Sequence, residues 1–532
     1  MPDFRKQEWK KIEDFLSQGK SRLAVVYGRP GMGLHGLLKK ISENRPTLFF
    51  KASPTCSDME NRLFSSSIGM QTVTGDLSRI LDWISGQARL LSGDQELLLI
   101  LSSYKNFIAA SPENDETLRH YAADVWKELP IKVILADESI LCMKKAFESP
   151  DSPWTKIDHV RLCLPPLSFA EAGDFLRGFR PEDAIFLYGM TGGIPALLEK
   201  ISPDGKAWTA LADEPDRNAQ TAVSGFSGGK ISTLSDLPGR KKSTSYAAVN
   251  MPSILEKLFH PDNRKPCHPE SIIENELREP AFYNRLLTAL ASGYQRVGEI
   301  AQETGRPKDI VVPYLNTLIR LGLVKKERPM TEKGNQRKTR YSIVNTGDLF
   351  WYRYLAYHYD LLAKRQYDRI WTRVLLPDRS KFEKEVFVKI AGQYLLHCEG
   401  RLPFQVEELG GWWEYAGKSK NRPDRKGLQS LLPDEEGPAG GLFRGFDLIG
   451  SGSLQDQPAS VFCRIYYDEK PVDVGEIKSL IALSRRLFQG GNHYYMIFSR
   501  AGFDRNARTV AEAIPEIILL TVSETAAWLL NS

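Results

Sequence analysis

Short apolar runs alternate with helix-like stretches over the first part of the chain. Predicted strands cover residues 23–27, 47–50, 97–101 and 131–136. Between them, apolar residues recur at helical spacing, for example over residues 77–84 and 118–128. Because continuous apolar strands separated by helices are typical of a parallel sheet covered on both faces, this pattern predicts an α/β fold.

The pattern changes further along the chain. Residues 168–199 are predicted to be helical with a break at 192–195, whereas residues 203–250 are rich in small and polar side chains and predict a flexible linker. From Pro280 onward, three helical patterns precede a polar hairpin that ends at Ile343. This is the order of a winged helix-turn-helix. An aromatic-rich helix and a second α/β unit follow.

The composition is that of an ordinary globular chain, since 42% of its 532 residues are hydrophobic and 26% are charged. These values exclude a collagen-like, disulfide-scaffold or wholly disordered chain. Lysine and arginine number 71, and aspartate and glutamate number 66, which gives a net charge of +5. Such a balance does not by itself call for nucleic acid, so that argument must come from local clustering.

The cysteines and the apolar runs indicate in which cellular compartment the protein is expected. The six cysteines are too widely spaced for a CxxC knuckle, which argues against zinc and fits a reducing cytosol: Cys56, Cys142, Cys163, Cys267, Cys398 and Cys463. The N-terminus lacks an apolar signal segment, and the longest apolar run is far too short to span a bilayer. We expect a cytoplasmic protein with no membrane partner and no metal site.

A glycine-rich turn after the first strand occupies the place of a phosphate-binding loop. Such a loop needs glycines so that backbone N–H groups surround phosphates, a lysine for the β- and γ-phosphates, and a Ser/Thr hydroxyl for Mg²⁺. The candidate nucleotide-binding residues are Gly28, Arg29, Pro30, Gly31, Met32, Gly33, Leu34 and His35. The glycine spacing is kept, but Leu34 and His35 replace the lysine and the hydroxyl. Two interpretations stay open: the loop binds ATP, with or without Mg²⁺, through backbone amides, or it binds nothing.

The acids that hold Mg²⁺ and orient water are also missing from their expected strand. Residues 97–101 lead into Ser102 and Ser103, which form hydrogen bonds but carry no charge. Asp137 and Glu138 follow the next predicted strand, a position that suits a sensor loop better than a Walker B motif.

Basic residues cluster in the predicted winged helix-turn-helix. The candidate DNA-binding residues are Arg306, Lys308, Lys325, Lys326, Arg328, Arg337, Lys338 and Arg340. Clustered lysines and arginines on a hairpin track the phosphates of duplex DNA and give steep salt dependence. The alternative is that the charged hairpin is only solvated and that the segment packs against other protein.

Together, these pieces resemble the archaeal-type AAA+ ATPases of the STAND group, in particular members with a C-terminal domain of unknown function related to restriction endonucleases. The resemblance rests on residues 25–29, 188–195, 350–354 and 411–413. It implies a P-loop ATPase domain with a helical lid and ATP as cofactor, followed by a winged helix and a nuclease-like domain.

This chain departs from the family at its reactive positions. The family's P-loop ends Gly-Lys-Thr and its Walker B motif ends Asp-Glu, whereas residues 33–35 and 102–103 read Gly-Leu-His and Ser-Ser. In the nuclease-like domain, the resemblance assigns Glu383 and Asp447 as remaining acids, but Phe-Cys-Arg at 462–464 replaces Glu-x-Lys. Two carboxylates without the third acid and the lysine do not predict a nuclease.

The sequence therefore predicts an ATPase-family protein with eroded Walker motifs that acts as a regulator or scaffold and has lost efficient hydrolysis. One alternative is an active ATPase in which His35, Lys39 or Asp137 with Glu138 substitutes for the missing groups. Another is a DNA-binding regulator that uses the winged helix. Expected partners are double-stranded DNA and other proteins.

The predicted parts follow in order. They are an AAA+-like P-loop domain with a helical lid (1–202), a linker or insertion (203–262), a winged helix-turn-helix (263–348), a helical connector (349–380) and a nuclease-like α/β domain (381–532).

Overall fold

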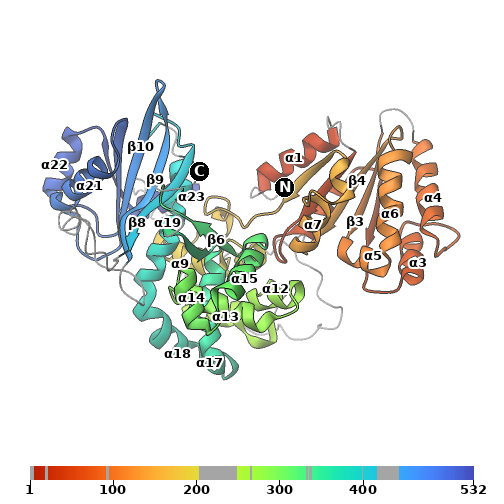
Figure 1. Ribbon diagram of the computed structural model, residues 1–532, viewed down its shortest axis with the longest axis horizontal. Helices are drawn as coiled ribbons and strands as arrows, with labels where there is room; N and C mark the ends of the chain where they lie inside the picture. The colour runs from red at the N-terminus through yellow and green to blue at the C-terminus, as the bar shows by residue number, and fades with distance from the viewer. Residues whose placement is uncertain are drawn as a thin grey trace, which may run out of the picture.

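The computed structural model describes residues 5–17, 22–91, 95–202, 249–263, 267–330, 334, 338–397, 400–415 and 442–531. Its two five-stranded sheets lie at opposite ends of the molecule, and helices occupy the space between them (Figure 1). Nearly all of the predicted linker at 203–250 lies outside the described residues.

The N-terminal sheet is parallel and has the strand order β2-β3-β4-β1-β5. Its strands are β1 (Leu23–Tyr27), β2 (Thr47–Lys51), β3 (Leu97–Ser102), β4 (Ile131–Asp137) and β5 (His159–Cys163). Every residue of β1, β3 and β4 is buried, because helices cover the central strands on both faces. The predicted α/β fold is confirmed, and its parallel sheet is typical of a P-loop NTPase core.

Helices flank this sheet and then form the lid. The flanking helices are α1 (Lys6–Ser17), α2 (Leu34–Ser42), α3 (Ser57–Ser67), α4 (Leu77–Arg89), α5 (Tyr104–Ala110), α6 (Pro112–His120) and α7 (Ile140–Phe147). The lid helices are α8 (Gly173–Leu176), α9 (Pro181–Thr191) and α10 (Pro195–Ile201). All residues from Ala184 to Thr191 are buried, whereas a surface helix buries one stripe. The lid helix α9 therefore lies inside the molecule.

The helical middle follows the lid. It contains α11 (Met251–Phe259), α12 (Pro269–Glu276), α13 (Pro280–Ala291), α14 (Val297–Thr304) and α15 (Lys308–Arg320), then the antiparallel strands β6 (Val324–Glu327) and β7 (Arg340–Ile343). The helices α13 to α15 and this strand pair occur in the order expected from the sequence. The chain continues through α16 (Thr346–Phe350), α17 (Tyr359–Ala363), α18 (Tyr367–Arg369) and the long α19 (Arg379–His397).

The C-terminal sheet has the order β12-β11-β10-β9-β8. Its strands are β8 (Glu408–Tyr415), β9 (Leu442–Leu454), β10 (Gln457–Tyr466), β11 (Asn492–Ser499) and β12 (Ile517–Thr521), with helices α21 (Val474–Leu487), α22 (Arg505–Ala513) and α23 (Val522–Asn531). The last helix returns to the lid, where Arg177 Nε donates to the carbonyl oxygen of Leu530 at 2.7 Å. No helix in the described part of the chain is long and apolar enough to cross a membrane.

Close packing between α9 and α19 generates a prediction about stability. A Cβ atom on Gly189 would lie 2.6 Å from Val386 Cγ2 and 2.8 Å from Phe382 Cε1. We expect Gly189→Leu to lower the free energy of unfolding by about 1–3 kcal/mol, because the core has no room for the added atoms. Urea denaturation measures this change.

Gly86 in α4 serves as the control, because a Cβ atom there meets nothing within 4 Å. Gly86→Ala should stabilise the chain by roughly 0.5–1 kcal/mol through helix propensity alone. A Gly189→Leu variant as resistant to urea as the wild type would contradict the packing of the lid against α19.

Candidate functional site

The turn between β1 and α2 keeps the backbone of a phosphate-binding loop. Gly31 and Gly33 have φ angles of +86° and +81°, which side chains other than glycine rarely adopt. Met32 between them is fully buried and anchors the loop in the core. Arg5 Nη2 donates to the carbonyl oxygen of Met32 at 2.9 Å, so the N-terminal segment also holds the loop.

A polar cleft of about 140 Å³ lies beside this loop at the carboxyl ends of the strands. Its walls are Leu34, His35, Lys51, Ser102, Ser103, Lys105, Asn106, Asp137 and Glu138. The structure thus brings together the two replaced P-loop positions, the Walker B position and the acids after β4. They meet because the carboxyl ends of parallel strands share one edge of the sheet.

The groups in this cleft do not fit Mg²⁺-ATP chemistry. Asp137 uses both carboxylate oxygens internally, since Oδ2 accepts the N–H of Lys105 at 2.7 Å and Oδ1 that of Ser139 at 2.6 Å. Burial raises the pKa of Asp137, although backbone N–H groups oppose this shift. In the described ranges, no three His, Cys, Asp or Glu side chains lie together as a metal site. Because Mg²⁺ demands oxygen ligands in octahedral geometry, no hydrolytic step follows from these residues.

Arg29, the charged residue of the loop, points away from the cleft and into the helical middle. Its Nη1 and Nη2 atoms each donate to a carboxylate oxygen of Asp348 at 2.8 Å. Both side chains are buried, with 7% and 2% exposure. Burial alone lowers the pKa of Arg29, but the charge of Asp348 outweighs this and raises it. The loop is therefore joined to α16 by a bidentate ion pair.

A hydrogen-bonded turn holds Asp348 in place against the lid. Asn345 Oδ1 accepts the N–H groups of Gly347 and Asp348 at 2.8 and 3.3 Å and so caps α16. Asn345 Nδ2 donates to the carbonyl oxygen of Gly192 at 2.7 Å. Gly192 ends α9 with a φ of +62°. The predicted break in the lid is thus the point where the lid meets α16.

The predicted DNA-binding residues fall into two groups. Arg306, Lys308, Lys325 and Lys326 are exposed on α14–α15 and β6. Arg328 is half-buried, Lys338 is buried, and Arg337 lies outside the described residues.

The C-terminal sheet contacts Lys338 and the half-buried Arg340. Trp413 Nε1 donates to the carbonyl oxygen of Lys338 at 3.0 Å, and the Arg340 guanidinium lies 3.9 Å from the centre of the Trp413 ring. A Cβ atom on Gly410 would lie 2.4 Å from Met330 Cγ. The sequence did not predict this contact between the hairpin and Trp413, because the two segments are far apart in the chain.

The two acids of the nuclease-like prediction have separate cationic partners. Glu383 is fully buried and its Oε1 lies 2.5 Å from Arg379 Nε. Asp447 Oδ1 lies 3.8 Å from Lys384 Nζ, and its Oδ2 accepts the N–H of Ile465. Arg464 donates to the carbonyl oxygen of Gly445 at 2.8 Å. Each carboxylate is engaged inside the protein, and a nuclease-like origin of this sheet stays a prediction.

No family model matches the chain. It is 23% identical over 414 residues to an uncharacterized protein of Methanocaldococcus jannaschii. The aligned region covers 77% of this chain and 81% of that protein. A solved Walker-type ATPase of Pyrococcus abyssi is similar at TM-score 0.40 and 15% identity, over 66% of this chain and 96% of that chain. The ORC2 protein of Aeropyrum pernix is similar at TM-score 0.39 and 13% identity, over 69% and 94%.

These likenesses are distant, so the class follows from the sheet and the loop themselves. A five-stranded parallel sheet with a glycine-rich turn between its first strand and helix defines an ATPase-like protein with a P-loop core of the AAA+ type. The P-loop ATPase fold that the resemblance implies is thereby confirmed.

The Arg29–Asp348 pair generates a stability prediction. Asp348→Asn leaves the buried guanidinium without its counter-charge, and removal of one partner of such a pair costs about 3–5 kcal/mol. We expect a matching fall in the free energy of unfolding by urea denaturation. Asp58→Asn, the same substitution in the exposed pair with Arg62, should leave the urea midpoint unchanged. Equal urea midpoints for Asp348→Asn and Asp58→Asn would contradict the prediction that the buried Arg29–Asp348 pair is needed for stability.

Glu327 in β6 generates a prediction about pH. Burial by itself raises its pKa, but the charges of Arg340 and Lys325 outweigh burial and hold the pKa at about 2, below the ordinary 4.5. The unfolded chain therefore binds a proton more readily between these values. The stabilisation is complete above pH 4.5 and is lost as the pH falls towards 2, by at most about 3 kcal/mol.

Glu327→Gln removes this titration. The difference in unfolding free energy between the wild type and Glu327→Gln should thus shrink as acid is added, which urea denaturation at stepwise pH measures. A difference that is constant from pH 5 to pH 2.5 would rule out the ion pairs as its cause.

Proposed function

We propose that this chain is an ATPase-fold regulatory or scaffold protein that does not hydrolyse ATP. The proposal rests on the contacts that the P-loop makes within the chain. Its charged side chain, Arg29, is committed to Asp348 in the helical middle, while Leu34, Ser102 and Ser103 line the cleft beside it. The loop serves as a docking element between the P-loop unit and the rest of the chain.

Phosphoryl transfer depends on positive charge at the β- and γ-phosphates and on a carboxylate-bound metal. Leu34 supplies neither charge nor a hydrogen-bond donor, and it is 4% exposed. The hydroxyls of Ser102 and Ser103 cannot replace two carboxylates as metal ligands. Nucleotide binding through backbone amides remains compatible with this proposal, whereas turnover does not.

The residues suggested as catalytic substitutes support an active ATPase less well. Lys39 is exposed in the last turn of α2 and does not line the cleft. His35 lies edge-on against Phe49, with 5.9 Å between the ring centres. Asp137 is engaged by backbone N–H groups.

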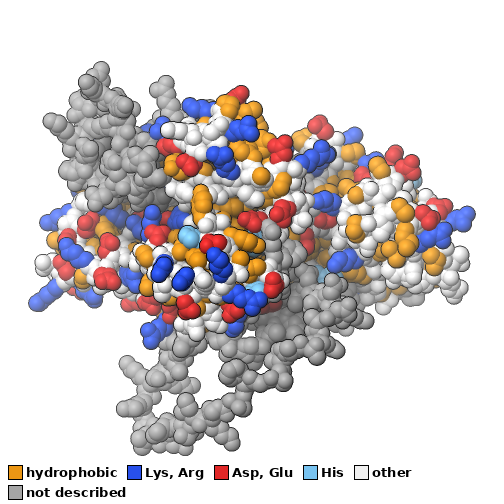
Figure 2. All heavy atoms as spheres, turned by 90° about the horizontal axis from the view of Figure 1, so that it is seen from below, with side chains coloured by type: hydrophobic (Ala, Val, Ile, Leu, Met, Phe, Trp, Pro, Cys, Tyr) orange, Lys and Arg blue, Asp and Glu red, His pale blue; other side chains and the backbone are white. Residues whose placement is uncertain are grey.

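Duplex DNA binding through the predicted wing is also less well supported. Lys338 is buried, and the Arg340 guanidinium packs against the ring of Trp413, which leaves fewer cations for phosphates. On the face of the molecule seen in Figure 2, lysine and arginine side chains are interspersed with aspartate and glutamate and form no single basic patch. Salt-dependent DNA binding requires such clustering.

In the proposed arrangement, the predicted parts have separate roles. The P-loop unit with its lid (1–202) is a platform, and the helical middle (263–380) docks on it. The C-terminal unit (381–532) covers the hairpin of the middle and returns α23 to the lid.

Phosphate release from ATP tests the proposal. We expect wild-type chain with Mg²⁺ to release phosphate no faster than Gly33→Asp, which puts a strained and negatively charged residue into the loop at φ +81°. Gly69→Asp is the matched control, since Gly69 has the same φ and open space around it. Mg²⁺-dependent release by the wild type and Gly69→Asp that Gly33→Asp abolishes would overturn the proposal.

A further inference from the structure

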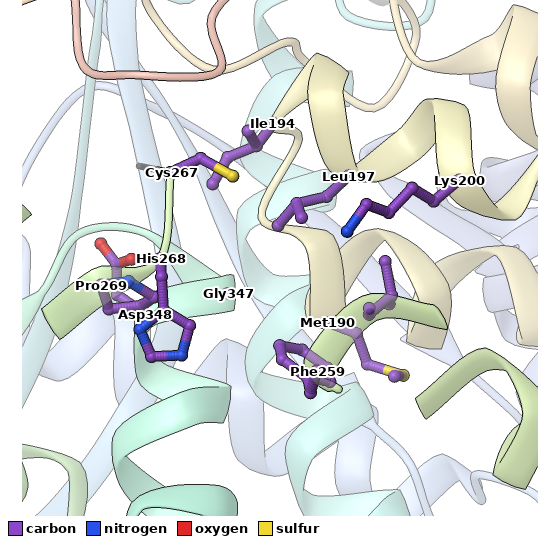
Figure 3. A pocket seen from close by; sticks show the side chains of 11 residues that line it. Met190, Ile194, Leu197, Lys200, Phe259, Cys267, His268, Pro269, Gly347 and Asp348 are labelled. Carbon is purple, nitrogen blue, oxygen red and sulfur yellow. The ribbon is translucent and has the colours of Figure 1, made fainter. Parts of the chain in front are cut away.

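Two further hollows in the described part of the chain differ greatly in size. One lies between the lid and the helical middle, where the Cys267 side chain points towards Ile194 of the lid (Figure 3). Its volume of about 20 Å³ leaves room for about one water molecule, and most of the side chains around it are apolar. The other lies on the C-terminal unit and has a volume of about 660 Å³. This value falls within the roughly 300–1,000 Å³ that is typical of small-molecule sites.

The larger hollow, which we call the outer cleft, lies at the amino end of β11. Its walls are the end of α21, the loop that follows it, the first residues of β11 and the connection from α22 to β12. Helices α21 and α22 lie at the end of the molecule away from the N-terminal sheet (Figure 1). Neither the P-loop nor the acids of the nuclease-like prediction line the outer cleft. It is therefore separate from both candidate sites considered so far.

The charged and amide side chains of the outer cleft are not engaged inside the protein. Arg485 and Glu516 line it and are exposed, and neither forms an ion pair with any described residue. The side-chain amides of Gln489 and Asn492, which also line it, have no hydrogen-bond partner among the described residues. In the cleft beside the P-loop, by contrast, Asp137 accepts two backbone N–H groups. The polar groups of the outer cleft are thus available to a ligand.

His493 forms an aromatic and uncharged part of the cleft wall. Its ring centre lies 5.0 Å from that of Phe462, with the rings close to edge-on. Burial lowers the pKa of His493, the hydrogen bond with the backbone of Gly490 opposes this shift, and the charge of Arg485 adds to it. The imidazole is therefore neutral at pH 7, because even its ordinary pKa of about 6.5 lies below that value. Arg485 and Glu516 remain as the one cation and the one anion that line the cleft.

The two opposite charges determine which ligand the cleft fits. A guanidinium such as that of Arg485 binds a carboxylate through two parallel hydrogen bonds, and the carboxylate of Glu516 accepts hydrogen bonds from an ammonium group. Because Arg485 and Glu516 do not pair with each other, a ligand can stand between them. A phosphate ester, with up to two negative charges, would meet one cation and would be repelled by Glu516. Ile481, Phe488 and Ile514 supply apolar surface for the rest of the ligand.

We propose that the outer cleft binds a small zwitterion with an apolar side chain, that is, an amino acid or a dipeptide. The ligand carboxylate pairs with Arg485, its ammonium group pairs with Glu516, and its side chain packs against Phe488 and Ile514. The inference does not depend on the proposed function, since the outer cleft shares no residue with the P-loop or with the cleft beside it.

Titration calorimetry on the full-length chain tests the proposal, with leucine, phenylalanine and leucyl-leucine as probes. We expect the wild type to bind at least one of them. Arg485→Gln and Glu516→Gln should each weaken that binding about tenfold or more, the factor expected for loss of hydrogen bonds between charged groups.

Arg505→Gln and Glu512→Gln are the matched controls, because these exposed side chains of α22 do not line the cleft. They should leave the affinity at the wild-type value. All four substituted side chains are exposed, so none of the substitutions disturbs the core.

Ligand analogues assign each charge of the zwitterion to its partner. Leucinamide lacks the carboxylate, so Arg485→Gln should weaken its binding far less than it weakens the binding of leucine. N-acetylleucine lacks the ammonium group, and Glu516→Gln should show the same pattern with it. Such non-additive losses are the mark of a direct contact. Losses that simply add, for both analogues, would overturn the assigned pairs.

The probes also distinguish the two sources of the zwitterion. Binding of leucine or phenylalanine without leucyl-leucine supports a free amino acid, and the reverse supports a dipeptide. No binding of any probe, or affinities that are equal in the wild type, Arg485→Gln and Glu516→Gln, would overturn the proposal. Uridine monophosphate is the test of an anionic ligand. If it binds, and if Glu516→Gln strengthens its binding while Arg485→Gln weakens it, the outer cleft is an anion site and the proposal of a zwitterion is wrong.

Discussion

A guanidinium and a carboxylate that face each other out of contact with water join the P-loop to the helical middle of the chain. Arg29 and Asp348 are 319 positions apart in the sequence. Because both side chains are buried, water cannot replace either partner if the pair is broken. A buried pair of this kind adds little net stability, because desolvation offsets the Coulomb attraction. Breaking it is nevertheless expensive, so it restricts the lid, α16 and the loop to one relative placement.

The rest of the site follows from that placement. With Arg29 turned towards α16, Asn345 reaches the end of α9, and Cys267 and Ile194 close on Gly31. Packing alone requires a glycine at position 31, since a side chain there would collide with Cys267. In the proposed function, the loop's backbone has a docking role that does not require the lysine and the hydroxyl of an active P-loop.

The sequence predicted strands correctly where every residue of the strand is buried. The strands β1, β3 and β4 are buried throughout because they are covered on both faces, and they coincide with predicted strands. The edge strand β5 was missed, since the charged or polar residues His159 and Arg161 interrupt its apolar pattern and only Leu162 is buried. The helix predicted over 118–128 instead begins at Pro112, after the capping residue Ser111. At Tyr121 it continues as a short π-helix. Here the local capping signal was the better guide.

The sequence by itself determined which chemical groups are present: a glycine-spaced loop without a lysine, a third strand that ends in serines, and Phe-Cys-Arg at 462–464 in the unit predicted to be nuclease-like. These are properties of single positions, and no folding step adds a missing charge. The tertiary structure alone decided what the remaining groups do. It placed Asp348 against Arg29, Cys267 over Gly31, and Trp413 against Arg340. Such pairs join positions far apart in the chain, and their energies depend on distance and exclusion of water, neither of which any local pattern of residues encodes.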